Sequence, residues 1–152
     1  MSKGLDIIII DADAKVANLT SKTIKRFYAW GKVFVFTDIK EAINYCLNRD
    51  IGVGIFIVDV FLNGASGFFF LDAIGEKFPT AHEDTIMVTG KANDDVVNMC
   101  VASNVKYLLE KPIKPYTLQL AVKAITARYL EFAKKLLKDP SLAETVAGLQ
   151  IK

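Results

Sequence analysis

Four polar residues that follow apolar segments of the chain carry complementary chemistry. They are Asp11, Asp59, Thr89 and Lys111. Two carboxylates suit a hard divalent cation such as Mg²⁺, which prefers oxygen ligands. A lysine ammonium and a threonine hydroxyl can both contact a phosphoryl oxygen. The four residues together therefore suit transfer of a phosphoryl group onto a carboxylate, a reaction in which the protein mainly positions groups and neutralises charge.

Each of these residues also has an ordinary structural role open to it. Asp11 and Asp59 could cap the loops that follow them, and Lys111 could form an ion pair without function. For each residue considered alone, the structural role is the preferred interpretation. The four together favour a common site, provided that the fold brings them to one place.

The apolar segments before these residues have the pattern of strands in a parallel sheet. Ile, Val, Leu and Phe occupy successive positions, which is typical of strands that are covered on both faces. The expected strands are residues 5–10, 33–36, 53–58, 85–88 and 105–109, and segments of helical period occupy residues 14–28, 39–47, 67–78, 94–102 and 116–137. This alternation predicts an α/β fold with a five-stranded, doubly wound parallel sheet and five helices. Functional groups gather beyond the carboxyl ends of the strands in such a sheet, and the four polar residues lie there.

Composition indicates a single globular domain without a nucleic-acid or membrane partner. The chain has 152 residues, 52% hydrophobic residues and a net charge of +2 without a concentrated basic stripe. No apolar run is long enough to span a bilayer, so we expect a cytoplasmic protein.

The cysteines and the histidine offer no further site. Cys46 and Cys100 lie far apart inside helical patterns and are expected to be buried as small hydrophobic residues. The single histidine, His82, leaves a zinc site or a Ser-His-Asp triad without the necessary partners.

Three segments resemble motifs of the response regulator receiver domain of two-component signalling. Residues 57–67 resemble its phosphoacceptor loop, residues 86–90 its fourth strand with the switch hydroxyl, and residues 109–113 its Lys-Pro motif. The resemblance covers about residues 5–130 and implies the flavodoxin-like strand order 2-1-3-4-5. We therefore expect a receiver domain at residues 1–130 and a C-terminal helical extension at residues 131–152.

The resemblance also implies a role for each residue of the site. Asp59 would be the phosphoacceptor, and Thr89 and Lys111 would contact its product. Asp11, Asp59 and the backbone carbonyl of Phe61 would bind Mg²⁺. A histidine kinase or phosphotransfer protein would supply the phosphoryl group, and the modified chain would regulate an output partner. The chain would not be an enzyme beyond accepting, and slowly hydrolysing, its own aspartyl phosphate.

Two positions depart from the family pattern. Ala12 occupies the place of a direct metal ligand, so we expect weaker Mg²⁺ binding unless Asp13 or water fills the gap. Leu108 replaces the usual switch aromatic, and Tyr107 points to the opposite face of its strand. Together with Phe69, at a usually polar helix position, these departures support an alternative: a degenerate receiver that binds partners without phosphorylation.

Two further hypotheses concern residues near the site. Phe61 is expected to screen the phosphoryl group from water and to slow its hydrolysis. Residues 10–13 also resemble the DxD loop of haloacid dehalogenase-type phosphatases, with Asp11 as nucleophile and Asp13 as acid. That family needs an acidic pair after the lysine, and this interpretation leaves Asp59 unexplained, so it is the less favoured one.

The last helical period continues an apolar face beyond the expected edge of the domain, through Tyr129, Phe132, Ala133 and Leu136. Asp139 and Pro140 should break that helix, after which residues 141–149 could form a short second one. The extension either folds back on its own domain or forms a helical contact with a second copy or a partner.

Overall fold

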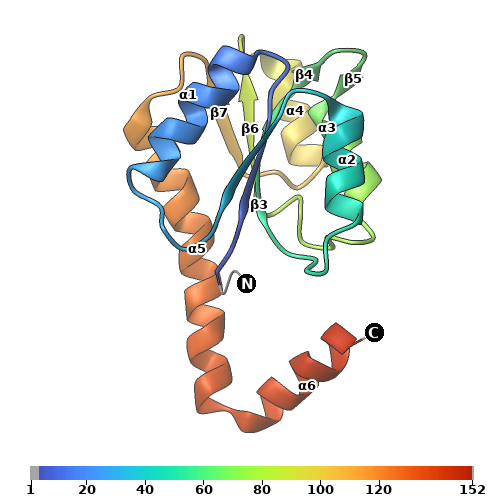
Figure 1. Cartoon of the computed structure of the whole chain (residues 1–152), viewed down its shortest axis with the longest axis vertical. Coiled ribbons are helices and arrows are strands. Elements are labelled where there is room, and N and C mark those ends of the chain that lie inside the picture. Colours follow the sequence, from blue (N-terminus) through green and yellow to red (C-terminus); the bar gives the residue numbers. More distant parts are fainter. Residues whose placement is uncertain (1–3, 152) are drawn as a thin grey trace. The chain divides into compact units, whose positions relative to one another are not determined.

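The computed structural model describes residues 4–151, and the side chains of residues 4–145. Strands and helices alternate along the chain as predicted (Figure 1). In order they are β1 (Ile7–Ile10), α1 (Ala14–Lys25), β2 (Val33–Phe36), α2 (Ile39–Leu47), β3 (Ile55–Asp59), β4 (Phe61–Leu62), β5 (Ala65–Ser66), α3 (Gly67–Ile74), β6 (Thr85–Thr89), α4 (Asp94–Ala102), β7 (Tyr107–Glu110), α5 (Pro115–Lys138) and α6 (Pro140–Ile151).

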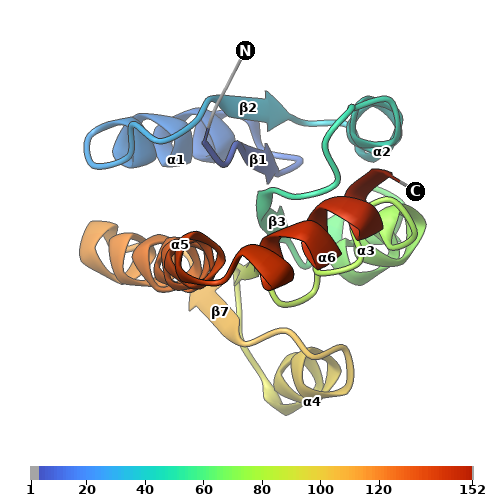
Figure 2. The same cartoon turned by 90° about the horizontal axis from the view of Figure 1, so that it is seen from below.

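Five of the strands form one parallel sheet in the order β2-β1-β3-β6-β7, which confirms the predicted flavodoxin-like arrangement. The register places Ile10 beside Val58 and Asp59 beside Val88, so the central strands end at nearly the same level. Helix α1 and the first turns of α5 cover one face of the sheet, whereas α2, α3 and α4 cover the other (Figure 2). The residues that follow β1, β3 and β6 therefore meet at one edge.

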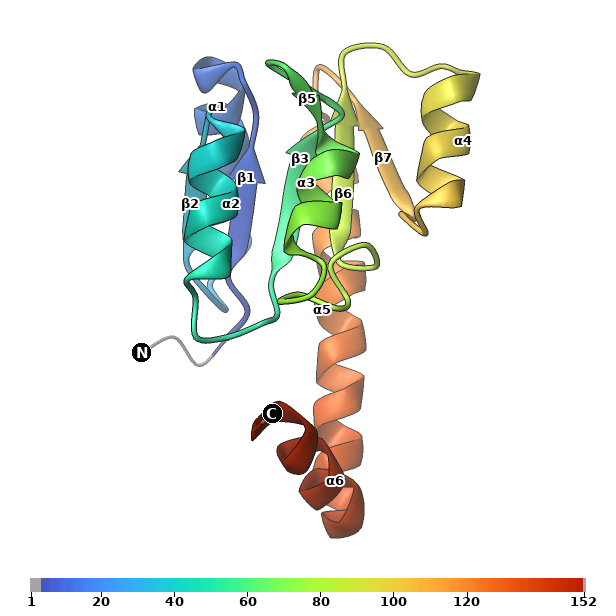
Figure 3. The same cartoon turned by 90° about the vertical axis from the view of Figure 1, so that its right-hand side faces the viewer.

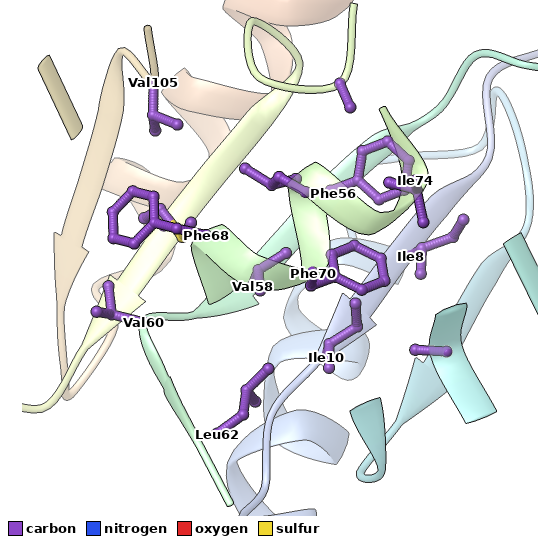
Figure 4. Packing of buried hydrophobic residues seen from close by; sticks show 14 of the residues in the cluster. Ile8, Ile10, Phe56, Val58, Val60, Leu62, Phe68, Phe70, Ile74 and Val105 are labelled. Atoms are coloured by element: carbon purple, nitrogen blue, oxygen red, sulfur yellow. The ribbon is translucent and has the colours of Figure 1, made fainter. Parts of the chain in front are cut away.

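The central strands are hydrophobic at successive positions because both of their faces are covered. All four isoleucines of β1 are buried, as are all five residues of β3 and of β6. Phe56 of β3 makes edge-on ring contacts with Phe70 of α3 and with Phe78, at centroid distances of 5.9 and 5.3 Å. Figure 4 shows Phe56 and Phe70 packed together between α3 and the sheet, and Phe78 belongs to the same buried cluster. Each fully buried side chain of this size contributes about 1.5–3 kcal/mol to folding, so the core fixes the strand ends firmly.

A two-stranded hairpin, β4–β5, was not predicted from the sequence and lies just beyond the end of β3 (Figure 3). Its two-residue strands are too short to show a period of two. Gly64 takes a φ of 78° at the turn, a conformation that favours glycine. A Cβ atom on Gly67 would stand 2.5 Å from the carbonyl oxygen of Asp59, so only glycine allows α3 to begin this close to the phosphoacceptor candidate.

Helix α1 ends at Lys25, three residues earlier than the predicted end at Tyr28. The helical spacing of apolar residues predicted too late an end because the Tyr28 side chain is buried although Tyr28 lies outside the helix. Its hydroxyl donates a hydrogen bond to the carbonyl oxygen of Leu5, two residues before β1.

The chain divides into two compact units within α5, after Val122. The predicted boundary after residue 130 stays a prediction. In the second unit α5 continues to Lys138, and α6 follows the break at Asp139, whose carboxylate accepts a hydrogen bond from the amide of Leu142. Leu130, Phe132 and Leu137 are exposed on α5. Within residues 4–151, no helix is long and apolar enough to cross a membrane.

Candidate functional site

The predicted site residues Asp11, Asp59 and Lys111 meet at the carboxyl edge of the sheet. The Lys111 Nζ lies 2.7 Å from Asp59 Oδ2 and 2.9 Å from Asp11 Oδ2, so one ammonium is shared by two carboxylates. Asp11 follows β1, Asp59 ends β3 and Lys111 follows β7, so three different strands deliver the three groups. Both aspartates are buried, at 4% and 7% exposure, and the cluster carries one more negative than positive charge.

The other oxygens of the two carboxylates are held by backbone amides. Asp59 Oδ1 accepts a hydrogen bond of 3.0 Å from the amide of Phe61, and Asp11 Oδ1 accepts one of 2.9 Å from the amide of Asp13. These bonds orient both carboxylates because each is fixed at one oxygen and faces Lys111 with the other. The Phe61 ring itself is 62% exposed.

Asp13 does not take the place of the missing ligand at Ala12. Its carboxylate Oδ1 accepts hydrogen bonds from the amides of Lys15 and Val16, at 2.9 and 3.4 Å, and thereby caps the N-terminus of α1. A residue directly before a predicted helix is the usual position for such a cap, so this role could have been found in the sequence. The cap also leaves the phosphatase interpretation without its second acid.

Thr89 is fully buried at the end of β6, beside β3 and β7. Its hydroxyl donates to the carbonyl oxygen of Lys91 at 3.1 Å and accepts from the amide of Lys91 at 3.3 Å. The hydroxyl is thus committed to the loop that leads into α4. To reach a group on Asp59, it has to release the Lys91 carbonyl.

Two groups of the site, the Asp11 carboxyl and the Lys111 ammonium, have raised pKa values. Burial raises the pKa of the Asp11 carboxyl, and hydrogen bonds from Lys111 and the Asp13 amide offset this only in part. Burial by itself would lower the pKa of Lys111, but its hydrogen bonds to Asp59 and Asp11 outweigh that effect and raise it. The lysine therefore stays charged at neutral pH, whereas burial opposes the ionised form of Asp11.

The donor atoms of the site are oxygens, the ligand type that Mg²⁺ prefers. Asp11 and Asp59 offer carboxylate oxygens, and Phe61, whose backbone carbonyl is the third expected ligand, begins β4 two residues after Asp59. Nowhere among the described residues do three or more His, Cys, Asp or Glu side chains form a group that could hold a metal ion. An ion bound by two carboxylates and a carbonyl would keep several water ligands, which Mg²⁺ commonly does.

Comparison with known proteins settles the family. The family model described as the response regulator receiver domain matches residues 7–123, which is more than half of the chain. The chain belongs to this family. No curated protein sequence matches it, so the assignment rests on the family model and on the fold.

Solved receiver structures share the fold of this receiver domain at low sequence identity. The beryllofluoride-activated DrrB receiver domain of Thermotoga maritima is 21% identical with a TM-score of 0.69, covering 82% of this chain and 98% of that one. The chemotaxis protein CheY4 of Vibrio cholerae is 19% identical with a TM-score of 0.68, covering 80% and 98%. A CheY-like receiver from Methanospirillum hungatei is 20% identical with a TM-score of 0.70, covering 85% and 99%. These likenesses concern the fold alone.

One contact of the receiver site was missed by sequence reasoning. Glu110, directly before Lys111, accepts a hydrogen bond of 2.7 Å from the amide of Ala92 through its Oε2 atom. The two residues are eighteen positions apart, and no local pattern links them. Leu108, two residues before Glu110 on β7, packs against the buried core.

Proposed function

We propose that this receiver domain accepts a phosphoryl group on Asp59 from a histidine kinase or a phosphotransfer protein and thereby regulates an output partner. The observation that carries the proposal is the Lys111 ammonium shared between Asp11 and Asp59. Such a cluster keeps a net negative charge for a divalent cation and offers a cation to a phosphoryl oxygen.

In this reaction an oxygen of the Asp59 carboxylate attacks the phosphorus of a phosphohistidine. A phosphorus–oxygen bond forms, the phosphorus–nitrogen bond breaks, and the leaving imidazole takes up a proton. Lys111 lies within reach of the new phosphoryl oxygens, and Thr89 can donate its hydroxyl once it has left Lys91. Asp11, Asp59 and the Phe61 carbonyl would hold Mg²⁺, which supplies further neutralisation of the phosphoryl charge when bound.

The test is incubation of the full chain with Mg²⁺ and acetyl phosphate, followed by intact-mass measurement. We expect one phosphoryl group on the wild type and on Asp72→Ala, a control that removes an exposed carboxylate of α3. We expect none on Asp59→Ala. A parallel titration with beryllofluoride, a stable mimic of an acyl phosphate, avoids losses by hydrolysis. If the wild type responds to neither reagent, the proposal is wrong.

The same experiment tests the second candidate, a receiver that binds partners without phosphorylation. That candidate is favoured by Ala12 together with the commitment of the Asp13 carboxylate to the cap of α1. Partner binding that is equal in wild type and Asp59→Ala, with no mass change in either, would support it.

Phe61 is proposed to slow the hydrolysis of the aspartyl phosphate. Its amide is bonded to Asp59, so its side chain starts beside the phosphoacceptor. We expect Phe61→Asn to lose the phosphoryl group faster than the wild type, as followed by intact mass after removal of the donor. An unchanged half-life would contradict this role.

The helical extension is proposed to contribute a contact with a second copy. Support comes from the exposed apolar residues Leu130, Phe132 and Leu137 on α5, beyond the end of the family match. Sedimentation of the full chain and of a variant ending at residue 130 should give a dimer for the first and a monomer for the second. Two monomers would exclude this contact.

A further inference from the structure

The loop between β6 and α4 is held by side chains at three consecutive residues. The Thr89 hydroxyl bonds both the amide and the carbonyl of Lys91. The amide of Ala92 donates to Glu110 at 2.7 Å, a short bond of the kind expected when the acceptor is ionised. Asn93 then caps α4 by accepting from the amide of Val96 at 2.9 Å. Of these three attachments, only the one to Glu110 comes from a residue that is distant in the sequence, on β7.

Strand β7 places Glu110 so that it can reach this loop. Thr89 and Glu110 are register partners, and the amide of Lys111 donates to the carbonyl oxygen of Thr89 at 2.8 Å. Side chains two residues apart in a strand share a face, so Glu110 lies on the face of Leu108, which packs against the core. Consecutive residues thus contact the two carboxylates and the loop: Lys111 bonds Asp11 and Asp59, and Glu110 bonds Ala92.

We propose that Glu110 is a positioning residue that holds the loop of residues 90–93 in the arrangement in which the Thr89 hydroxyl is bonded to Lys91. The inference rests on the proposed phosphorylation of Asp59 and adds a residue that sets its response. For Thr89 to donate to a phosphoryl oxygen, its hydroxyl has to release the Lys91 carbonyl, and this release frees residues 90–93 to move. Because Glu110 is fixed on β7, its bond to Ala92 opposes that movement and stabilises the unmodified state.

A contact made only in the unmodified state lowers the population that is competent to bind a phosphoryl mimic. Glu110→Ala should therefore bind beryllofluoride more tightly than the wild type, with about a fivefold lower half-saturation concentration in the presence of Mg²⁺. Glu110→Gln keeps an oxygen acceptor for the Ala92 amide and should stay within about twofold of the wild type. Glu41→Ala removes an exposed carboxylate of α2 and serves as the matched control, with no expected change.

A second measurement needs no phosphoryl mimic. Hydrogen exchange of the Ala92 amide, followed by NMR on the unmodified proteins, should be about fivefold faster in Glu110→Ala than in the wild type and in Glu110→Gln. Equal exchange in Glu110→Ala and wild type would overturn the proposal, as would unchanged or weaker beryllofluoride binding by Glu110→Ala. If the wild type itself does not bind beryllofluoride, the proposed function fails, and the exchange rates alone decide whether Glu110 holds the loop.

Discussion

Strand β1 has a buried aspartate at each end, and the two are neutralised in different ways. Before the strand, Asp6 Oδ2 accepts a hydrogen bond from Arg49 at 2.9 Å, and Asp6 Oδ1 accepts one from the amide of Lys32 at 2.8 Å. The Arg49 guanidinium also donates to the Tyr45 hydroxyl at 3.0 Å. It lies 5.6 Å from the centre of the Tyr45 ring and 5.9 Å from that of Phe34.

After the strand, Asp11 shares the ammonium of Lys111 with Asp59. At the first end, Asp6 pairs with the guanidinium of Arg49, which makes planar contacts that lysine does not make. This Asp6–Arg49 contact is called the matched pair. The second end has two anions and one flexible cation. The difference teaches that burial of charge serves structure at one end of β1, whereas the excess negative charge at the other is suited to binding a cation.

The largest expected effect concerns the matched pair. Arg49→Ala removes the guanidinium that contacts the buried Asp6 carboxylate, which should lower the free energy of unfolding by about 3 kcal/mol. Urea denaturation measures the free energy of unfolding. Arg26→Ala serves as the control because it removes an exposed arginine directly after α1. The double variant Asp6→Asn/Arg49→Met should regain most of the loss because no charge is then buried. A loss below about 1 kcal/mol in Arg49→Ala would mean that the pair is not structural.

At the other end of the strand, an added carboxylate should strengthen cation binding. Ala12→Asp restores the ligand that the family pattern carries and should raise Mg²⁺ affinity about tenfold, or ~1.4 kcal/mol. Isothermal titration calorimetry measures the change, and Asn18→Asp adds the same charge on the exposed face of α1 as a control. Equal affinities for Ala12→Asp and wild type would show that the charge excess of the site does not govern metal binding.

A smaller effect should separate Asp13 from the site. Asp13→Ala loses the cap of α1 and should lower the free energy of unfolding by about 1 kcal/mol, while Asp13→Asn keeps an acceptor and most of the stability. Neither change should alter Mg²⁺ affinity, since the Asp13 carboxylate bonds Lys15 and Val16. A fall in affinity comparable to that of Asp11→Ala would identify Asp13 as a ligand after all.

The smallest expected effect is in the pH dependence of stability, because opposing contacts partly cancel the cost of burying Asp11. Its pKa is raised in the fold, chiefly by burial, so the folded state binds its proton more readily than the unfolded state does. The cost of its ionised form is therefore present at neutral pH and is relieved as the pH falls through the raised value.

Comparison of variants isolates this contribution. The stability of the wild type relative to Asp11→Asn should rise when the pH is lowered from 7 toward 4, as measured by urea midpoints. Asp38→Asn, which changes an exposed carboxylate before α2, should show no such trend. A wild type that loses stability relative to Asp11→Asn on acidification would show that the carboxylate is favoured in its ionised form.

Much of the site could be predicted because the ends of buried strands can be recognised in the sequence. Asp11, Asp59 and Lys111 each follow an apolar segment, and the parallel order of the strands brings these ends to one edge. The hydrophobic runs of β1, β3 and β6 were found for the same reason, since strands covered on both faces leave a continuous apolar pattern. The hairpin β4–β5 has strands of two residues, which are too short to leave any pattern.

Side-chain partners were the part that the sequence left open. From the sequence alone, Asp13 was considered as a replacement metal ligand, whereas in the structure its carboxylate caps α1. Arg49 and Asp6 are 43 positions apart, and Glu110 and Ala92 are 18 apart, so only the register of the folded sheet brings each pair together.

By itself, then, the sequence determined the order of the elements, the buried strands and the edge at which the polar residues collect. These follow from periodicity and burial, which are properties of consecutive residues. The tertiary structure decided which charges are paired, which carboxylate caps a helix and which one holds the loop after Thr89. Those choices depend on distances between side chains from different elements. They pair Asp6 with Arg49 at one end of β1 and place two carboxylates around Lys111 at the other.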